Sequence, residues 1–272
     1  MKKGLIVLIT VLSLLVIAFG GYFVYDNFFN DKESLSKEKD SNPGDETKTT
    51  ETRNVTETEL KEIYKILDKV QGVSLGIKKI SNFNAVDNNL KLNIANFNNH
   101  EEPFMKKTWE DELKKIFGSN VILSDDSYYC DIKHGEDSEI LYNYDETTGK
   151  YILNENHVGH GGDGYPMTLN YSLIDSKVVN DTFEISLHKL ILINWIGEYG
   201  IYGEEIIARN NELFPLTDFI DEDFMTIDEQ AVLKHYLENY DAYKLKSATY
   251  KYTFKKQNDK FILTGYDYIP VK

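Results

Sequence analysis

Apolar residues fall into blocks of different period along the chain, and each period predicts a kind of element. They recur at helical spacing from Leu60 to Val70 and again from Trp109 to Phe117. The capping box Thr56-Glu57-Thr58-Glu59 predicts the start of the first helix. Pro103 and Gly118 predict the two ends of the second. Two amphipathic helices are therefore expected in the first half of the folded region.

Alternation of apolar and polar residues predicts strands over much of the remainder. Short strands are expected at Val73 to Ile80 and at Leu90 to Ile94. From Asn120 onward the alternating runs pair into hairpins, and a third helix with a capping-box pattern is expected near Thr226 to Tyr240. The three predicted hairpin turns are Asp145 to Gly149, Asn180-Asp181 and Asn258-Asp259.

Strands that follow each other through tight turns pair antiparallel, and helices set apart from them indicate an α+β fold. The expected fold is therefore α+β, with antiparallel sheets built from hairpins, helices packed on one side, and a single transmembrane helix in front. The expected organisation is an anchor or signal segment at residues 1–29, a tether at 30–55, and an extracellular domain at 56–272. A subdivision of that domain is considered near 118–120 or 196–225.

The first 29 residues predict the location of the protein. Lys2 and Lys3 precede an uncharged run from Gly4 to Val24, which as a helix would span roughly 30 Å, the thickness of a bilayer core. The lysines place the N-terminus in the cytoplasm and the C-terminal domain outside the cell membrane, as a single-pass protein. The alternative is cleavage near Gly20, after small residues at signal-peptidase spacing, which would release a secreted protein.

The segment from Asn30 to Val55 has almost no large apolar side chains and is rich in Ser, Thr, Lys, Asp and Glu. Such a segment buries too little surface to offset its chain entropy, so a disordered tether is expected.

Composition narrows the classes of partner. The chain has 272 residues, 41% of them hydrophobic, which is enough for a sizeable core. Its formal net charge is -15, and Arg53 and Arg209 are its arginines. Such a surface repels phosphate backbones and lacks bidentate donors, so nucleic-acid binding is not expected. The single cysteine, Cys130, cannot form an internal disulfide and is expected to be buried.

Two resemblances follow from these residues. The Lys-Lys start with its apolar run, followed by the Ser/Thr/Lys/Glu tether, resembles uncharacterised signal-anchored extracellular proteins of low-GC Gram-positive bacteria. This resemblance implies a location and no activity. The closing sequence YKYTFKKQNDKFILTGYDYI resembles the last hairpin of NTF2-like or cystatin-like sheets.

The stretch HVGHGGDGYP contains the candidate metal ligands. His157, His160 and Asp163 offer two imidazoles and a carboxylate, a set that suits Zn or a similar divalent ion, and His134 is a candidate fourth ligand. The glycines between them rule out the regular helical face of an H-E-x-x-H metalloprotease. The alternatives are a loop for a non-metal ligand or partner and a plain turn.

Two acidic clusters are further candidates for cation binding. The first lacks the spacing of a calcium loop, which favours a solvated acidic face. The second precedes the third predicted helix and would interact favourably with its N-terminal end. The first comprises Asp125, Asp126, Asp131, Glu136 and Asp137, and the second Asp218, Asp221, Glu222 and Asp223.

No catalytic motif is found, which favours a non-enzymatic role. The leading hypothesis is a membrane-tethered extracellular domain that binds a cell-wall polymer or another surface protein, without a cofactor. The 19 tyrosines suit such contacts. The first alternative is a metal-dependent hydrolase or metal-binding accessory protein using the loop with His157, His160 and Asp163. The second is a structural subunit of a membrane complex.

Overall fold

The protein is described by a computed structural model. All described residues belong to one compact unit, Thr49–Lys272. No helix within them is long and apolar enough to cross a membrane. The predicted anchor at 1–29 and nearly all of the predicted tether at 30–55 lie outside the residues that the structure describes. The described residues are 51–70, 75, 79–98, 104–134, 137–155, 167–195, 198–204, 212–221 and 226–271.

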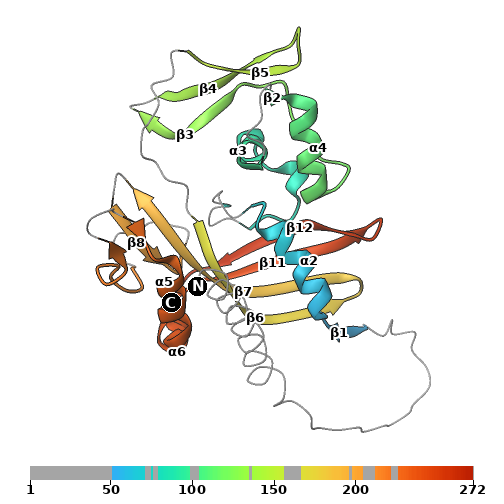
Figure 1. The fold of residues 1–272 in the computed structure, drawn as a ribbon. Coiled ribbons are helices and arrows are strands. Elements are labelled where there is room, and N and C mark those ends of the chain that lie inside the picture. Colours follow the sequence, from blue (N-terminus) through green and yellow to red (C-terminus); the bar gives the residue numbers. More distant parts are fainter. Residues whose placement is uncertain are drawn as a thin grey trace, which may run out of the picture. The chain divides into compact units, whose positions relative to one another are not determined.

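The fold is α+β with antiparallel sheets, as the sequence pattern predicts. The largest sheet has six strands, and its main path runs in the order β1-β6-β7-β11-β12 (Figure 1). Along one edge of β7, β11 pairs with Thr182–Leu187 and β8 pairs with Ile191–Trp195. The strands are β1 (Thr52–Asn54), β6 (Met167–Val179), β7 (Thr182–Trp195), β8 (Glu198–Tyr202), β11 (Thr249–Gln257) and β12 (Lys260–Ile269).

Tight turns join β6 to β7 and β11 to β12. Asn180, Asp181, Asn258 and Asp259 all have positive φ angles, between 47° and 62°. Asn and Asp tolerate this left-handed conformation, which two-residue hairpin turns require. Both turns are therefore confirmed at the predicted residues.

A second, four-stranded sheet has the order β2-β5-β4-β3. The turn between β4 and β5 confirms the predicted hairpin around Asp145 to Gly149. Strands β9 and β10 form a separate two-stranded sheet. The strands of the four-stranded and two-stranded sheets are β2 (Phe104–Met105), β3 (Tyr128–His134), β4 (Asp137–Asp145), β5 (Lys150–Leu153), β9 (Ile220–Asp221) and β10 (Thr226–Ile227).

The described residues form five α-helices and two short 3-10 helices. Thr56 and Glu59 form the predicted capping box at the start of α2. Helix α4 ends before Gly118, as predicted, but it begins at Lys106 and not at Pro103, because Phe104–Met105 pair with β5 as strand β2. The bounds are α2 (Glu57–Leu67), α3 (Asn88–Asn98), α4 (Lys106–Phe117), α5 (Glu229–Glu238), α6 (Tyr240–Tyr243), η1 (Phe83–Ala85) and η2 (Lys244–Lys246).

Three further local predictions are wrong. The alternating run from Leu90 to Ile94 lies in helix α3, not in a strand. Helix α5 is capped by Asp228, whose Oδ1 accepts from the backbone N–H groups of Gln230 and Ala231, and not by Thr226. Strand β1 lies within the segment predicted to be tether, because Thr52–Asn54 pair with β6.

Two hydrophobic clusters lie on the two faces of the six-stranded sheet. Side chains alternate along β7, so Phe183, Ile185 and Leu187 share one face with the large cluster that includes Ile63 and Leu67 of α2. On the other face, Leu190 and Leu192 pack in a smaller cluster, which also contains Val232 and Tyr236 of α5. Helices therefore pack on both faces, whereas the sequence pattern predicted one.

Candidate functional site

The predicted metal ligands His157, His160 and Asp163 lie outside the described residues, so this prediction stays a prediction. His134 ends strand β3, where it pairs with Asp137, but its side chain also falls outside the description. The same holds for the side chain of Cys130. Within the described part of the chain, no group of three His, Cys, Asp or Glu side chains is placed to hold a metal ion.

Two described acidic residues of the first predicted cluster have local partners, whereas Glu222 and Asp223 of the second cluster lie outside the described residues. Asp125 forms an ion pair with Lys106, which is the first cause that lowers the pKa of the Asp125 carboxyl. Asp126 accepts a hydrogen bond from the hydroxyl of Ser124. This part of the first cluster is therefore a solvated face engaged in local contacts, as the spacing favoured.

A depression that could take a ligand lies on the face of the large sheet that carries α5. We call it the polar groove; it has a volume of about 660 Å³. Thr182, Glu184 and Ser186 of β7 line it, whereas Leu190 and Leu192 of the smaller hydrophobic cluster lie further along the same strand. Its polar lining residues are Lys79, Ser81, Asp175, Lys177, Thr182, Glu184, Ser186, Lys251, Thr253, Lys255, Thr264 and Asp267.

Strand register organises this lining into cross-strand rows. Asp175, Ser186, Lys251 and Asp267 are successive partners across β6, β7, β11 and β12. The next row is Lys177, Glu184, Thr253 and Gly265. Their neighbours along each strand, such as Tyr250, Tyr252 and Phe254 on β11, are buried on the opposite face. The alternation that builds the core therefore also builds a polar face.

A short segment forms a wall along the β12 side of the groove. The backbone N–H of Ile80 donates to the carbonyl of Tyr266 at 2.7 Å, and the N–H of Tyr266 donates to the carbonyl of Ile80 at 2.8 Å. Gly265 allows this close approach: a Cβ there would lie 3.3 Å from the Ile80 carbonyl oxygen and 3.3 Å from the Cβ of Thr253. The groove thus keeps an open floor between Thr253 and the wall.

The charges of the groove are only partly paired. Lys177 forms an ion pair with Glu184 at 3.2 Å, and Lys79 approaches Asp267 at 3.9 Å. Lys251 and Lys255 are exposed on β11 and form no ion pair with any described residue. In a chain with a net charge of -15, two lysines without a carboxylate partner among the described residues offer positive charge to a ligand.

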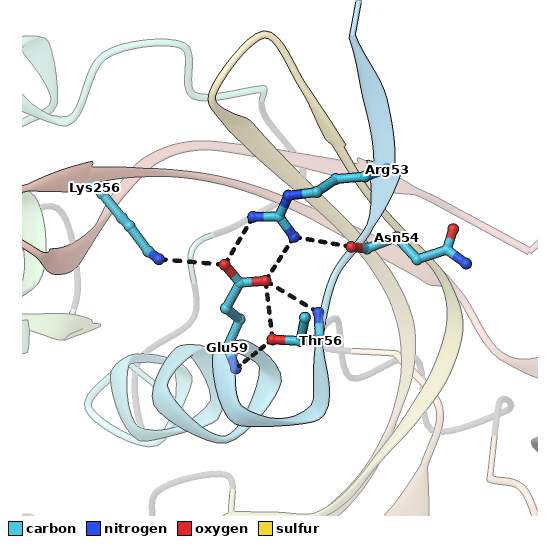
Figure 2. Close-up of polar contacts among 5 residues, drawn as sticks. All are labelled: Arg53, Asn54, Thr56, Glu59 and Lys256. Carbon is cyan, nitrogen blue, oxygen red and sulfur yellow. Dashed lines mark hydrogen bonds and ion pairs between the residues drawn. The ribbon is translucent and has the colours of Figure 1, made fainter.

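Lys256 follows Lys255 on β11 and lies on the opposite face of the sheet, where, unlike Lys255, it has a carboxylate partner among the described residues. Its Nζ lies 3.2 Å from Oε1 of Glu59, and Figure 2 shows the same carboxylate held by Arg53 and by the backbone N–H of Thr56. Lys256 also lies over the rings of Phe183 and Phe261. Neighbouring lysines on β11 thus have different roles: Lys256 is part of the fold, whereas Lys255 faces the groove.

A smaller depression adjoins the groove around the edge of β12. We call it the amide pocket; it has a volume of about 210 Å³ and shares Ser81 and Thr264 with the groove. The side chain of Gln257 bridges it, accepting from the backbone N–H of Ser119 and donating to the Ser119 hydroxyl. The described residues that line it carry no charge. They are Ser81, Asn82, Phe83, Asn84, Phe117, Gly118, Ser119, Asn120, Gln257, Ile262, Leu263 and Thr264.

Two buried basic residues of β7 do not belong to the groove. Lys189 is 2% exposed, on the opposite face, with its Nζ 4.6 Å from the centre of the Tyr250 ring. His188 lies at the boundary between groove and smaller cluster, with Nδ1 2.9 Å from the hydroxyl of Tyr240. Burial, with a smaller effect of Lys244, lowers the pKa of His188. The contacts of both side chains fix the sheet and the helices that cover it.

Sequence reasoning did not single out the groove, although the alternation of polar residues on its strands was visible. Lys251, Thr253 and Lys255 alternate with buried aromatic residues in the predicted hairpin. Their partners on β7 and β6 lie more than sixty residues away, and no local pattern brings them together. Chemically, the groove offers ammonium groups, carboxylates and hydroxyls on a rigid sheet, which suits binding of a polar ligand.

Comparison of the chain with protein-family models, with curated proteins and with solved structures finds no match.

Proposed function

We propose that the protein is a membrane-tethered extracellular domain that binds a partner through the polar groove and catalyses no reaction. The observation that supports this role is the pair Lys251 and Lys255, which face a groove of about 660 Å³ without a carboxylate partner among the described residues. The apolar N-terminal run and the polar segment after it supply the anchor and the tether of this proposal.

The position of the groove on a sheet favours recognition. A sheet held by backbone hydrogen bonds and two hydrophobic clusters fixes the side chains before a ligand arrives, which lowers the entropy lost on binding. The hydroxyls of the half-buried residues Thr182, Ser186 and Thr253 add donors and acceptors beside the lysines. The partner classes that fit are a cell-wall polymer or a polar surface of another exported protein.

Cysteine labelling in intact cells tests location and occupancy together. In a Cys130→Ser background, Thr253→Cys places a thiol in the groove and Lys61→Cys places one on the exposed surface of α2. A membrane-impermeant maleimide is expected to label Lys61→Cys equally fast in cells and in the purified chain. Labelling of Thr253→Cys is expected to be slower in cells, because a partner covers it.

The outcomes separate the two parts of the proposal. If neither thiol reacts in intact cells, the extracellular location is wrong. If both react in cells as fast as in the purified protein, the groove is unoccupied and the binding role is wrong.

A further inference from the structure

We infer that the polar groove and the amide pocket together bind one acidic glycan chain, with sparse anionic groups over the groove and an uncharged sugar in the pocket. This inference rests on the proposed function and names its ligand class.

The charge pattern selects ligands with widely spaced anions. Lys251 and Lys255 are four residues apart on one strand, so their Cα atoms are separated by roughly 13 Å. Asp175, Glu184 and Asp267 occupy positions around and between them. A densely charged polymer would bring anions against these carboxylates, whereas a chain with occasional carboxylates can place each one at a lysine.

The net charge of the chain does not prevent this interaction. At physiological ionic strength the screening length is about 8 Å, so charges elsewhere on the molecule are largely screened from a ligand in the groove. The lysines and carboxylates that line the groove therefore decide which anion binds.

Hydroxyl groups between the lysines favour a hydroxylated ligand. Thr253 lies between Lys251 and Lys255 on β11, and Ser186 and Thr182 are the cross-strand partners of the two lysines. Hydroxyls both donate and accept, so they match the hydroxyls of a sugar ring in either orientation. The large apolar residues of the lining, Ile80, Ile185, Tyr252 and Tyr266, are all buried, so a peptide with large apolar side chains would find few contacts.

The amide pocket extends the same chemistry without charge. Its polar side chains are amides and hydroxyls, and Asn120 is exposed at its rim. Amide groups can donate to and accept from neighbouring sugar hydroxyls or acetamido groups. Because the pocket shares Ser81 and Thr264 with the groove, a linear chain can pass from one depression into the other without leaving the surface.

Titration of the full-length chain with oligomers of matched length tests the ligand class. The probes are a hyaluronan hexasaccharide, with a carboxylate on every second sugar, a neutral chitin hexasaccharide, a short polyphosphate, and a peptide of alternating glutamate and serine. The hyaluronan fragment is expected to bind most tightly. Lys251→Gln/Lys255→Gln should weaken its binding by about tenfold, the effect of losing two exposed charge contacts.

Matched variants assign the effect to the two depressions. Lys61→Gln/Lys107→Gln removes the same charge from exposed helical positions and should leave the affinity unchanged. Asn120→Ala should weaken binding of the hexasaccharide by a few-fold and leave the affinity for a disaccharide unchanged, because only the longer chain reaches the pocket.

The following results would contradict an acidic glycan as the ligand. Tightest binding of polyphosphate or of the peptide, or equal binding of chitin and hyaluronan with no effect of Lys251→Gln/Lys255→Gln, would overturn the inference. If no probe binds while Thr253→Cys is protected in cells, the ligand class is wrong and the proposed function stands. If no probe binds and Thr253→Cys is unprotected, both fail.

Discussion

Arg53 and Glu59 meet through two parallel hydrogen bonds of 2.8 Å, one to each carboxylate oxygen. This pair joins strand β1 to helix α2, and Lys256 joins the same carboxylate to strand β11 (Figure 2). We call the group of Arg53, Thr56, Glu59 and Lys256 the Glu59 clamp. It ties the first described residues of the chain to the hairpin that forms part of the groove.

Removing the charge of Glu59 should weaken the fold. Glu59→Gln keeps the side chain at the capping position but replaces its charged contacts with Arg53 and Lys256. The expected loss is about 1–2 kcal/mol of the free energy of unfolding. Urea denaturation measures it. Glu62→Gln is the control. Among the described residues Glu62 pairs only with exposed Lys65 of the same helix, so this variant should lose less than about 0.5 kcal/mol. Equal losses in both variants would contradict the role of the clamp.

The clamp also predicts a dependence of stability on acid. Hydrogen bonding from Arg53, aided by Thr56 and Lys256, holds the pKa of Glu59 well below its ordinary value of 4.5. The unfolded chain therefore binds a proton at Glu59 more readily, and the contribution of this residue is complete above about pH 4.5 and declines as the pH falls below it. The stability difference between wild type and Glu59→Gln should shrink from pH 6 to pH 3. If this stability difference stays constant from pH 6 to pH 3, the lowered pKa of Glu59 does not contribute to the stability of the fold.

His188 predicts a second pH effect, in a different range. Burial lowers its pKa below the ordinary 6.5, so the unfolded chain takes up a proton more readily than the folded one. Stability should therefore fall as the pH drops below about 6.5. Urea midpoints at pH 7.5 and pH 5.5 should differ less in His188→Gln than in wild type. If the urea midpoint changes with pH as much in His188→Gln as in wild type, groups other than His188 cause the pH dependence.

Two glycines with positive φ should differ in their tolerance of alanine. Gly118, at the C-terminal end of α4, has a φ of 90°, and a Cβ there would lie 2.8 Å from Oε1 of Gln257. Gly149 has a φ of 67° with nothing within 4 Å of such a Cβ. Gly149→Ala should cost about 1 kcal/mol of conformational strain. Gly118→Ala should cost more, because it also displaces Gln257 and deforms the amide pocket. Thermal denaturation compares the two, and equal costs would contradict the close approach of Gln257.

The local part of the fold was predictable where the physical cause is local. The turns at Asn180-Asp181 and Asn258-Asp259 rest on two residues that accept positive φ. The capping box of Thr56 and Glu59 rests on contacts three residues apart. Such features depend on neighbours in sequence, so the sequence pattern is sufficient to predict them.

Helix α3 shows why a local pattern can mislead. Leu90, Leu92 and Ile94 alternate with polar residues, but the helix is buried on several sides and so lacks a clear polar face. Lys91 and Asn93 are buried with partners: the Nζ of Lys91 donates to the carbonyl of Asn84, and Oδ1 of Asn93 accepts from the hydroxyl of Tyr128. Tertiary contacts therefore override the apparent period of two.

The groove itself could not be predicted, because it depends on pairing between distant strands. Ser186 and Lys251 become neighbours only when β7 pairs with β11, and Ile80 forms the wall only by pairing with Tyr266. The local pattern instead indicates the loop with His157, His160 and Asp163, where candidate ligands are close in sequence. That loop stays a prediction, as does its metal.

Photo-crosslinking from the groove tests the central claim most directly. A photoreactive amino acid replaces Thr253 in the full-length chain, and cells are irradiated before the protein is purified and its adducts are identified by mass. We expect a discrete adduct at this position, its yield several-fold lower when Lys251→Gln and Lys255→Gln are added, and no such adduct from the same group at Lys61. Absence of an adduct at position 253, or an equal yield with and without the two lysines, would contradict a binding role for the groove.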